Sequence, residues 1–183
     1  MVDLGAGTGR LALAVAEISR RVVAVDVSPA MLASIASTAA ERRLANVECV
    51  RAGFLSYEHI GEPADFVYSR NALHHLPDFW KAIALVKIAA FLLPGGVLRL
   101  RDIVYDFEAG EAEQYIERWL DAGADDAAEG WTRRERETHV RDEQSTFGWL
   151  LEPMIARAGF ELRRADYDEG KIFASYVAVK RSP

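Results

Sequence analysis

The chain has 183 residues, half of them hydrophobic, so it can bury one ordinary core, and its length favours one domain over two. Acidic residues number 28 against 22 lysines and arginines, and the resulting net charge of −6 repels polyanions, so we expect no nucleic-acid partner. The single cysteine excludes an intrachain disulfide and a thiolate metal cluster, and the lack of both a signal peptide and an apolar run of ~20 residues predicts a cytoplasmic protein with no membrane span.

Short β-rich runs alternate with helical runs from the first residue onward, which is typical of a parallel sheet covered by helices on both faces. Residues 21–27 form a continuous β-branched run, as expected for a strand that is buried on both sides. Ser28 and Pro29 then provide the N-cap and the first-turn proline of a helix. The predicted strands span residues 2–4, 21–27, 47–51, 65–69, 97–104, 160–167 and 173–180, and the predicted helices span 10–18, 29–43, 80–92, 111–120 and 147–158.

The end of the chain departs from this repeating pattern. A turn at 168–170 joins the last two strands as a hairpin, so one strand must run antiparallel to the rest. Residues 106–145 are polar and charged, and we expect this insertion after strand five to act as a lid or a mobile segment of a single domain, 1–183. Aromatic residues flank the insertion: a lid or interface position is as well supported as core packing for Trp131, whereas Trp149 is expected in the core.

A glycine-rich turn follows the first strand. Gly5, Gly7 and Gly9 alternate in the segment that begins at Asp3, and glycine lets the backbone come within contact of a ligand. A dinucleotide-binding turn would need a glycine where the chain has Arg10, so the sequence disfavours an NAD-dependent reductase. The acidic Asp3 beside the turn suits a cationic sulfonium ligand better than a diphosphate.

A second acidic residue, Asp26, ends the second predicted strand. In a parallel sheet that end lies beside the glycine turn, where a carboxylate can accept hydrogen bonds from both hydroxyls of a ribose. The competing interpretation is that Asp26 only caps the helix that begins after Ser28. The neighbouring turn favours the ribose interpretation.

Four segments, in order, resemble the motifs of class I S-adenosylmethionine-dependent methyltransferases. Residues 2–10 and 22–32 resemble the first two motifs. Residues 65–76 resemble the strand-four motif of the small-molecule branch, which includes the ubiquinone and menaquinone methyltransferases. Residues 92–98 resemble the motif that leads into strand five. The resemblance implies an α/β Rossmann-like methyltransferase fold with a mostly parallel seven-stranded sheet, in the order 3-2-1-4-5-7-6 with the last strand antiparallel. It also implies S-adenosylmethionine as the cofactor and S-adenosylhomocysteine as the product.

The same resemblance implies the residues that contact the cofactor. Gly5, Gly7 and Gly9 would line the methionine and ribose part of the cofactor, with Asp3 beside the turn. Asp26 would hold the ribose, and Val27 and Met31 would flank the adenine. Asn71 would lie near the methionine end.

Two departures from the family pattern affect this expectation. Where the family often has an aspartate after strand three, the chain has Gly53 and Phe54, so the adenine would rely on backbone groups and on stacking against Phe54. A hydrogen bond to a charged group contributes about 1.5–3 kcal/mol, so we expect cofactor binding to be weaker by about tenfold or more. Family members usually carry some tens of residues before the glycine turn, whereas only residues 1–4 precede it here. We therefore expect a short first strand and no N-terminal helices over the substrate.

The candidate chemistry lies beyond strand four. Holding a nucleophile against an activated methyl group lowers the activation barrier by as much as ~7 to 11 kcal/mol. A base is needed only if the acceptor must lose a proton. His74 and His75 are the candidate bases, with His75 favoured, and the alternative is that the pair shapes the loop. We expect no metal site, because adjacent histidines cannot readily aim at one ion and no carboxylate stands at helical spacing from them.

Two functions remain open at this point. The first is methyl transfer to an oxygen, nitrogen or carbon of a small molecule by in-line displacement. The second is a catalytically silent cofactor-binding or subunit-interaction protein of the same fold.

Apolar surface left uncovered at the first strand favours a homodimer.

Overall fold

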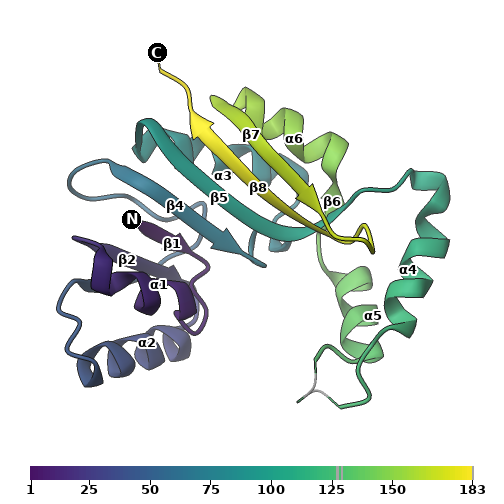
Figure 1. The fold of residues 1–183 in the computed structure, drawn as a ribbon, viewed down its shortest axis with the longest axis horizontal. Helices are drawn as coiled ribbons and strands as arrows, with labels where there is room; N and C mark the ends of the chain where they lie inside the picture. Colours follow the sequence, from purple (N-terminus) through teal and green to yellow (C-terminus); the bar gives the residue numbers. More distant parts are fainter. Residues whose placement is uncertain (127, 129, 183) are drawn as a thin grey trace.

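The computed structural model describes residues 1–126, 128 and 130–182. Within them, seven strands follow one another in the order β3-β2-β1-β4-β5-β8-β7, and an eighth, β6, pairs with β5 alone (Figure 1). The strands are β1 (Val2–Leu4), β2 (Val22–Asp26), β3 (Val47–Arg51), β4 (Ala64–Arg70), β5 (Leu92–Tyr105), β6 (Thr146–Phe147), β7 (Phe160–Tyr167) and β8 (Phe173–Lys180). The α-helices are α1 (Arg10–Val15), α2 (Pro29–Glu41), α3 (Asp78–Phe91), α4 (Ala112–Asp121), α5 (Arg133–Asp142) and α6 (Gly148–Arg157).

Strand directions agree with the sequence prediction. Strands β1 to β5 pair in parallel, and β8 runs antiparallel to both of its neighbours, β5 and β7. Since β7 and β8 are the sixth and seventh predicted strands, the predicted order 3-2-1-4-5-7-6 is confirmed. Strand β6 adds a two-residue parallel pairing to β5 that the sequence did not predict.

The sheet is covered on both faces, and β2 shows how the sequence achieves this. Val22 and Ala24 pack into a core cluster with α1 and α2, whereas Val23 and Val25 belong to the larger core on the other face, with residues of α3 and α6. Successive strand residues point to opposite faces, so a strand between two helical layers must be apolar throughout. The continuous apolar run of this strand therefore reports burial on both sides.

The insertion, residues 106–145, extends from the end of the sheet at which β5 finishes (Figure 1). Helix α4 covers part of the predicted helix 111–120, and a small third core, which includes Phe107, Trp119 and Ile172, holds the base of the insertion against the sheet. Helix α5 was not predicted. Its start carries a capping box, in which the Thr132 hydroxyl accepts from the Glu135 amide and the Glu135 carboxylate accepts from the Thr132 amide, and this T-x-x-E pattern is readable from sequence.

The structure departs from the sequence prediction in several places. Strand β5 begins at Leu92 rather than at residue 97, because the first part of the strand pairs with β4 across an irregularity in the register. Helix α6 continues through Pro153 without a break. The prediction that Trp149 is a core residue is wrong, because its side chain is 57% exposed and stacks on Phe147 at the surface.

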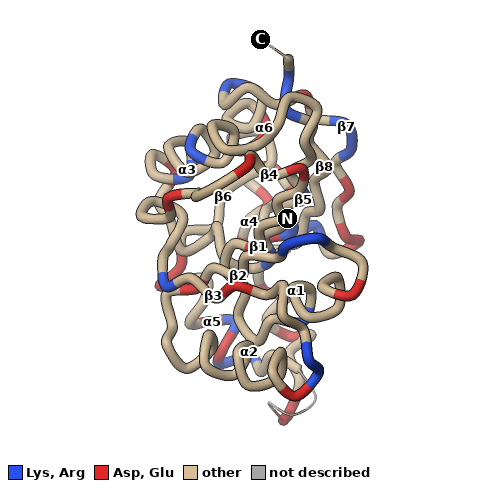
Figure 2. The backbone as a smooth tube through the Cα atoms, turned by 90° about the vertical axis from the view of Figure 1, so that its left-hand side faces the viewer, with Lys and Arg blue, Asp and Glu red and all other residues tan. Residues whose placement is uncertain are grey.

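Charged residues of both signs are interspersed along the backbone (Figure 2). Arg133, for example, pairs with Glu117, Asp121 and Glu137 on the α4–α5 surface, so the charges of this surface are paired with one another. No helix within the described residues combines the length and the hydropathy that crossing a bilayer requires.

Candidate functional site

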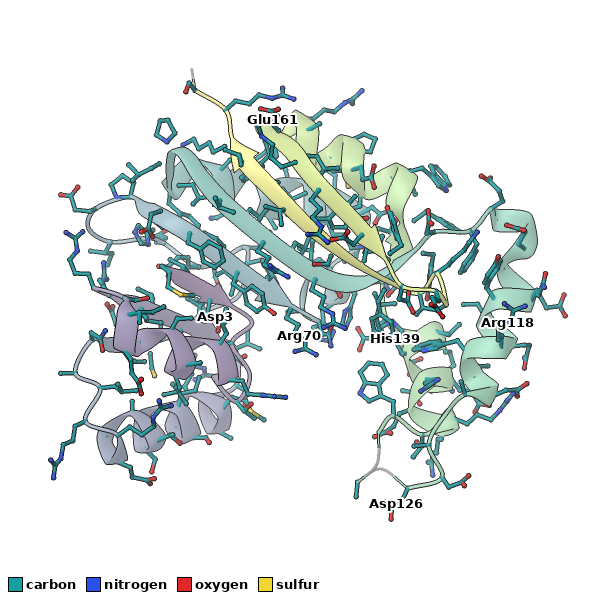
Figure 3. The ribbon with its side chains drawn as sticks, viewed as in Figure 1. Asp3, Arg70, Arg118, Asp126, His139 and Glu161 are labelled. Atoms are coloured by element: carbon teal, nitrogen blue, oxygen red, sulfur yellow. The ribbon has the colours of Figure 1, made fainter. Side chains whose placement is uncertain are left out.

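The strand register brings the predicted cofactor residues to one edge of the sheet. Leu4 pairs with Val25 of β2 and with Ser69 of β4, so these three strands finish at the same level. The residues that follow, including Asp26 and Asn71, therefore lie at the common carboxyl edge, which is where parallel α/β sheets bind ligands. Figure 3 shows Asp3, Arg70 and His139 along this edge, whereas Glu161 lies at the opposite end of the sheet.

The three glycines of the turn serve different purposes. All three have positive φ, between 54° and 73°, which favours glycine. A Cβ on Gly5 would lie 2.4 Å from the Cβ of Ala72, and a Cβ on Gly9 would lie 2.6 Å from a carbon of Ile35, so these two glycines permit close packing. A Cβ on Gly7 would meet no described atom within 4 Å. Of the three, Gly7 is therefore the glycine that faces open space.

The carboxylate of Asp26 links the turn to the second helix. Its Oδ2 accepts from the Gly7 amide over 2.8 Å, and its Oδ1 accepts from the Ser28 amide over 2.8 Å. The carboxylate thus joins the turn to the N-cap residue of α2, and the helix itself is capped by the Ser28 hydroxyl, which accepts from the Met31 amide. A carboxylate has about four acceptor positions, so Asp26, which is partly exposed, can still accept from a ligand hydroxyl.

Asp3 lies buried under the turn, with 3% of its surface exposed. Its pKa is raised to about 6, chiefly by burial and to a smaller extent by the nearby charge of Asp26, while a hydrogen bond from the Ala12 amide acts in the opposite direction. A buried carboxylate of this kind gains from a cationic ligand. It lines a cavity of about 240 Å³ whose other lining residues are Gly5, Ala6, Gly7, Thr8, Arg10, Leu11, Tyr68, Arg70 and Asn71.

The predicted adenine residues lie farther along the same edge. Val27 is 66% exposed and Met31 is 38% exposed, so both present apolar surface to solvent. A Cβ on Gly53 would lie 3.2 Å from Val27, so the segment after β3 closely approaches the segment after β2. Phe54 packs against the larger core, and its stacking on a ligand stays a prediction.

Asn71 connects this region to a second cavity. It follows β4 with a φ of 51°, unusual for a residue with a side chain, and its amide donates to the Arg101 carbonyl over 2.9 Å. Its Oδ1 is buried without a hydrogen-bond partner among the described residues. Asn71 lines both the 240 Å³ cavity and a cavity of about 350 Å³, so the two spaces meet at this side chain.

Histidines and carboxylates form the second cavity, whose lining residues are Asn71, His74, His75, Trp131, Glu135, Thr138, His139 and Glu143. His74 is buried, and its Nδ1 lies 2.5 Å from Oδ1 of Asp102, whose other oxygen accepts from the amides of Leu73 and His74. The Asp102 carboxylate therefore fixes both the loop after β4 and the orientation of the imidazole.

His75 and His139 occupy different environments in this cavity. The side chain of His75 is 58% exposed, and its Nδ1 lies 2.7 Å from Oε2 of Glu143. His139 is buried on α5, with its Nε2 2.8 Å from the Ser145 hydroxyl. Burial, followed by the charge of His74, lowers the pKa of His139 to about 4, so its imidazole is neutral near pH 7. His139 is therefore a buried member of the cavity lining.

Two acidic partners in this cavity were missed from the sequence. Asp102 lies near the carboxyl end of β5, as Asp26 does at the end of β2, so its position along its strand was a usable signal. Glu143 is the C-cap residue of α5, and its backbone amide donates to the His139 carbonyl over 2.9 Å. Glu143 lies 68 residues from His75 in the sequence, so a search for carboxylates at helical spacing from the histidine pair could not find it.

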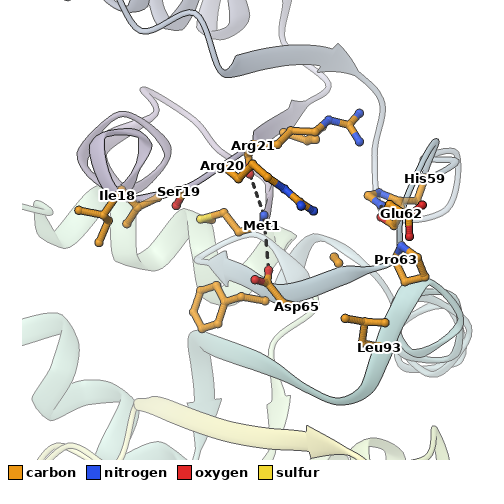
Figure 4. A pocket seen from close by; sticks show the side chains of 14 residues that line it. Met1, Ile18, Ser19, Arg20, Arg21, His59, Glu62, Pro63, Asp65 and Leu93 are labelled. Atoms are coloured by element: carbon orange, nitrogen blue, oxygen red, sulfur yellow. Dashed lines mark hydrogen bonds and ion pairs between the residues drawn. The ribbon is translucent and has the colours of Figure 1, made fainter.

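A further cavity, of about 470 Å³, lies at the amino ends of the strands (Figure 4). It is lined by Met1, Arg21, Pro63 and Leu93 among others, and the amino group of Met1 donates to the Arg21 carbonyl and lies 3.6 Å from the Asp65 carboxylate. None of the predicted site residues lines it. Its position opposite the carboxyl edge excludes it as the predicted cofactor site.

Comparisons with known proteins identify the family. A family model described as a methyltransferase domain matches residues 1–96 of the 183-residue chain, which is more than half. The chain therefore belongs to the methyltransferase-domain family. No match was found among curated protein sequences.

Solved structures show the same fold. An S-adenosylmethionine-dependent methyltransferase from Clostridium acetobutylicum is 12% identical with a TM-score of 0.74, over 99% of this chain and 83% of that one. Magnesium protoporphyrin IX methyltransferase from Synechocystis, with bound SAH, is 16% identical with a TM-score of 0.69, over 98% and 73%. The cyclase SpnF is 18% identical with a TM-score of 0.72, over 100% and 74%. The resemblance to methyltransferases is confirmed, and a place in the quinone branch stays a prediction.

Proposed function

We propose that the protein transfers a methyl group from S-adenosylmethionine to a small-molecule acceptor. The observation that carries this proposal is the junction at Asn71, where the cavity of the glycine turn meets the cavity of histidines. A methyl donor in the first cavity and an acceptor in the second would meet at this side chain. Methyl transfer needs this proximity above all else.

The residues in and beside the first cavity fit this cofactor. Gly7 leaves open space beside the turn, Asp26 retains acceptor positions for a ribose, and Asp3 supplies a buried carboxylate for a cationic group. The buried, unpartnered Oδ1 of Asn71 can accept from an amino group. When bound, S-adenosylmethionine supplies a methyl group on a positively charged sulfur, and transfer breaks the carbon–sulfur bond and leaves a neutral thioether.

On the acceptor side, the protein orients the acceptor and receives its proton. His75 faces the cavity and is paired with Glu143, so its imidazole can take a proton from an acceptor hydroxyl or amine, and the carboxylate stabilises the imidazolium that forms. His74, fixed by Asp102, is a positioning residue that holds the loop in place. Trp131, which is 39% exposed, offers an aromatic face to a planar or apolar acceptor.

Calorimetric titration with S-adenosylhomocysteine, followed by assays with labelled cofactor against phenols, quinones and amines, tests the proposal. We expect saturable binding and turnover that depends on the acceptor. Saturable binding without turnover of any acceptor would support the alternative of a silent cofactor-binding protein. Binding of NAD in place of S-adenosylhomocysteine would end both interpretations.

A further inference from the structure

We propose that His74, His75 and Glu143 bind one divalent transition-metal ion, of the Zn²⁺ class, with an open coordination position toward the acceptor cavity. We call these three residues the His–His–Glu cluster. Ion binding itself is independent of the proposed methyl transfer, and only the role of the ion rests on that function.

The geometry of the cluster is close to that of a metal site. One ligand atom from each of the three side chains lies within 4.8 Å of the other two. Ligands of a tetrahedral ion with bonds of about 2.1 Å lie about 3.4 Å apart, so small side-chain rotations bring the three atoms into range. Two imidazoles and one carboxylate form a known ligand set for catalytic zinc and for other first-row ions that keep open positions.

The surroundings of His74 are those of a metal ligand. Metal-binding histidines usually donate their second ring N–H to a carboxylate, which fixes the ring and raises its basicity. Asp102 accepts this bond from His74 Nδ1 over 2.5 Å, and both residues are at most 4% exposed. The other ring nitrogen of His74, Nε2, is then the one that carries a lone pair for an ion.

The charge of the cavity also favours a cation. Its lining includes the carboxylates of Glu135 and Glu143, and Asp102 lies directly behind His74. No described residue that lines this cavity is a lysine or an arginine. A divalent ion would therefore neutralise a site that is otherwise rich in lone pairs and negative charge.

An ion at this position would define the acceptor class. The ion together with two imidazoles and one carboxylate carries a net charge of +1, which favours an acceptor that binds through a hydroxyl able to ionise, such as a phenol. The coordinated hydroxyl loses its proton to solvent, and its oxygen keeps the electron pair that attacks the methyl group. The ion and a proton compete for the His75–Glu143 pair, so His75 acts as a base only in the metal-free protein.

Metal binding is tested on the purified full chain after dialysis against a chelator. Zn²⁺ is added, and equilibrium dialysis with elemental analysis gives the stoichiometry, while Co²⁺ in place of Zn²⁺ gives visible absorption bands that report the coordination geometry. We expect one ion per chain. Glu143→Gln and His75→Gln, both at exposed or partly exposed positions, should weaken binding more than tenfold.

Two further variants separate a built site from surface chelation. Asp102→Asn should weaken binding by about 10- to 100-fold, because the effect passes through His74. His59→Gln, at a histidine paired with Tyr57 outside the cavity, should leave binding unchanged. Titration with S-adenosylhomocysteine, which does not need the His–His–Glu cluster, checks that each variant is folded. Absence of stoichiometric binding, or equal binding by Glu143→Gln and the wild type, overturns the metal site and leaves the proposed function intact.

Discussion

The amide of Gly7 donates a hydrogen bond of 2.8 Å to the carboxylate of Asp26. This single bond joins the turn after β1 to the turn after β2, nineteen residues apart in the sequence. Both turns lie at the carboxyl edge of the sheet, so the bond holds together the two segments expected to contact the cofactor.

Asp26→Asn should weaken binding of S-adenosylhomocysteine by about tenfold or more, since a hydrogen bond to a charged group contributes about 1.5–3 kcal/mol. Calorimetric titration measures the change. Asp65→Asn is the control, because Asp65 is an exposed carboxylate at the amino end of β4 and should have no effect on affinity. Equal affinity of Asp26→Asn and the wild type would remove Asp26 from the binding site.

Gly7→Ala should abolish cofactor binding while costing only about 1 kcal/mol of stability, because a methyl group at this position enters the open space that the cofactor would occupy. Gly95→Ala is a matched control: Gly95 also has a positive φ, 78°, and an added Cβ there also meets no atom within 4 Å. The two variants should have similar melting temperatures, and only the first should lose binding. Loss of binding in both would point to a general effect of strain.

Asp3→Asn should stabilise the protein and weaken cofactor binding. The pKa of Asp3 is raised from 3.8 to about 6, so the folded state binds more protons than the unfolded state between these pH values, and stability falls as the pH rises through them. Removing the buried charge should therefore raise the free energy of unfolding at pH 7 by about 1–3 kcal/mol, with the gain vanishing near pH 4. Urea denaturation at several pH values measures this difference, and a destabilised variant at pH 7 would contradict it.

His139 should give stability the opposite dependence on pH. Its pKa is lowered from 6.5 to about 4, so between these values the unfolded state binds more protons, and stability falls as the pH falls. His139→Gln should remove about 1–3 kcal/mol of this acid sensitivity. The difference in the free energy of unfolding between wild type and variant is the quantity to follow, because Asp3 opposes the trend.

Lys81→Met should loosen the end of the insertion. Lys81 is 2% exposed, and its ammonium group donates to the Asp78 carboxylate over 2.8 Å and to the Gln144 carbonyl. Asp78 in turn accepts from the Thr146 hydroxyl over 3.0 Å. Losing these bonds should cost about 1–3 kcal/mol and speed hydrogen exchange in α5.

Binding of S-adenosylhomocysteine should stay unchanged in Lys81→Met, because the contacts lie on the acceptor side. Lys87→Met, on the same helix at a partly exposed position, should alter neither hydrogen exchange nor stability. Exchange in α5 that is unaffected by Lys81→Met would show that the insertion is held by other contacts.

The sheet could be predicted because its signals are local. A continuous apolar run such as 21–27, the cap at Ser28 and the hairpin turn at 168–170 each depend on neighbouring residues. The parallel register then follows from general rules of α/β folds, and it places Asp26 and Asn71 at one edge.

The second cavity could not be predicted in the same way. The contacts from His75 to Glu143 and from His74 to Asp102 join residues 68 and 28 positions apart. They depend on how α5 returns to the sheet, and the polar sequence of α5 hides the helix from a search for apolar periodicity. The T-x-x-E cap at Thr132 was the one local signal that could have revealed it.

The pairing of β5 with β6 brings the two ends of the insertion together. Val104 and Tyr105, which precede it, pair directly with Thr146 and Phe147, which follow it. The whole stretch therefore leaves and re-enters the sheet at adjacent positions, and its length and sequence can vary without displacing the strands that carry Asp3 and Asp26. Under the proposed function, we expect this insertion to carry much of the acceptor preference, so a graft of the corresponding segment from a relative should change the choice of substrate and leave binding of S-adenosylhomocysteine unchanged.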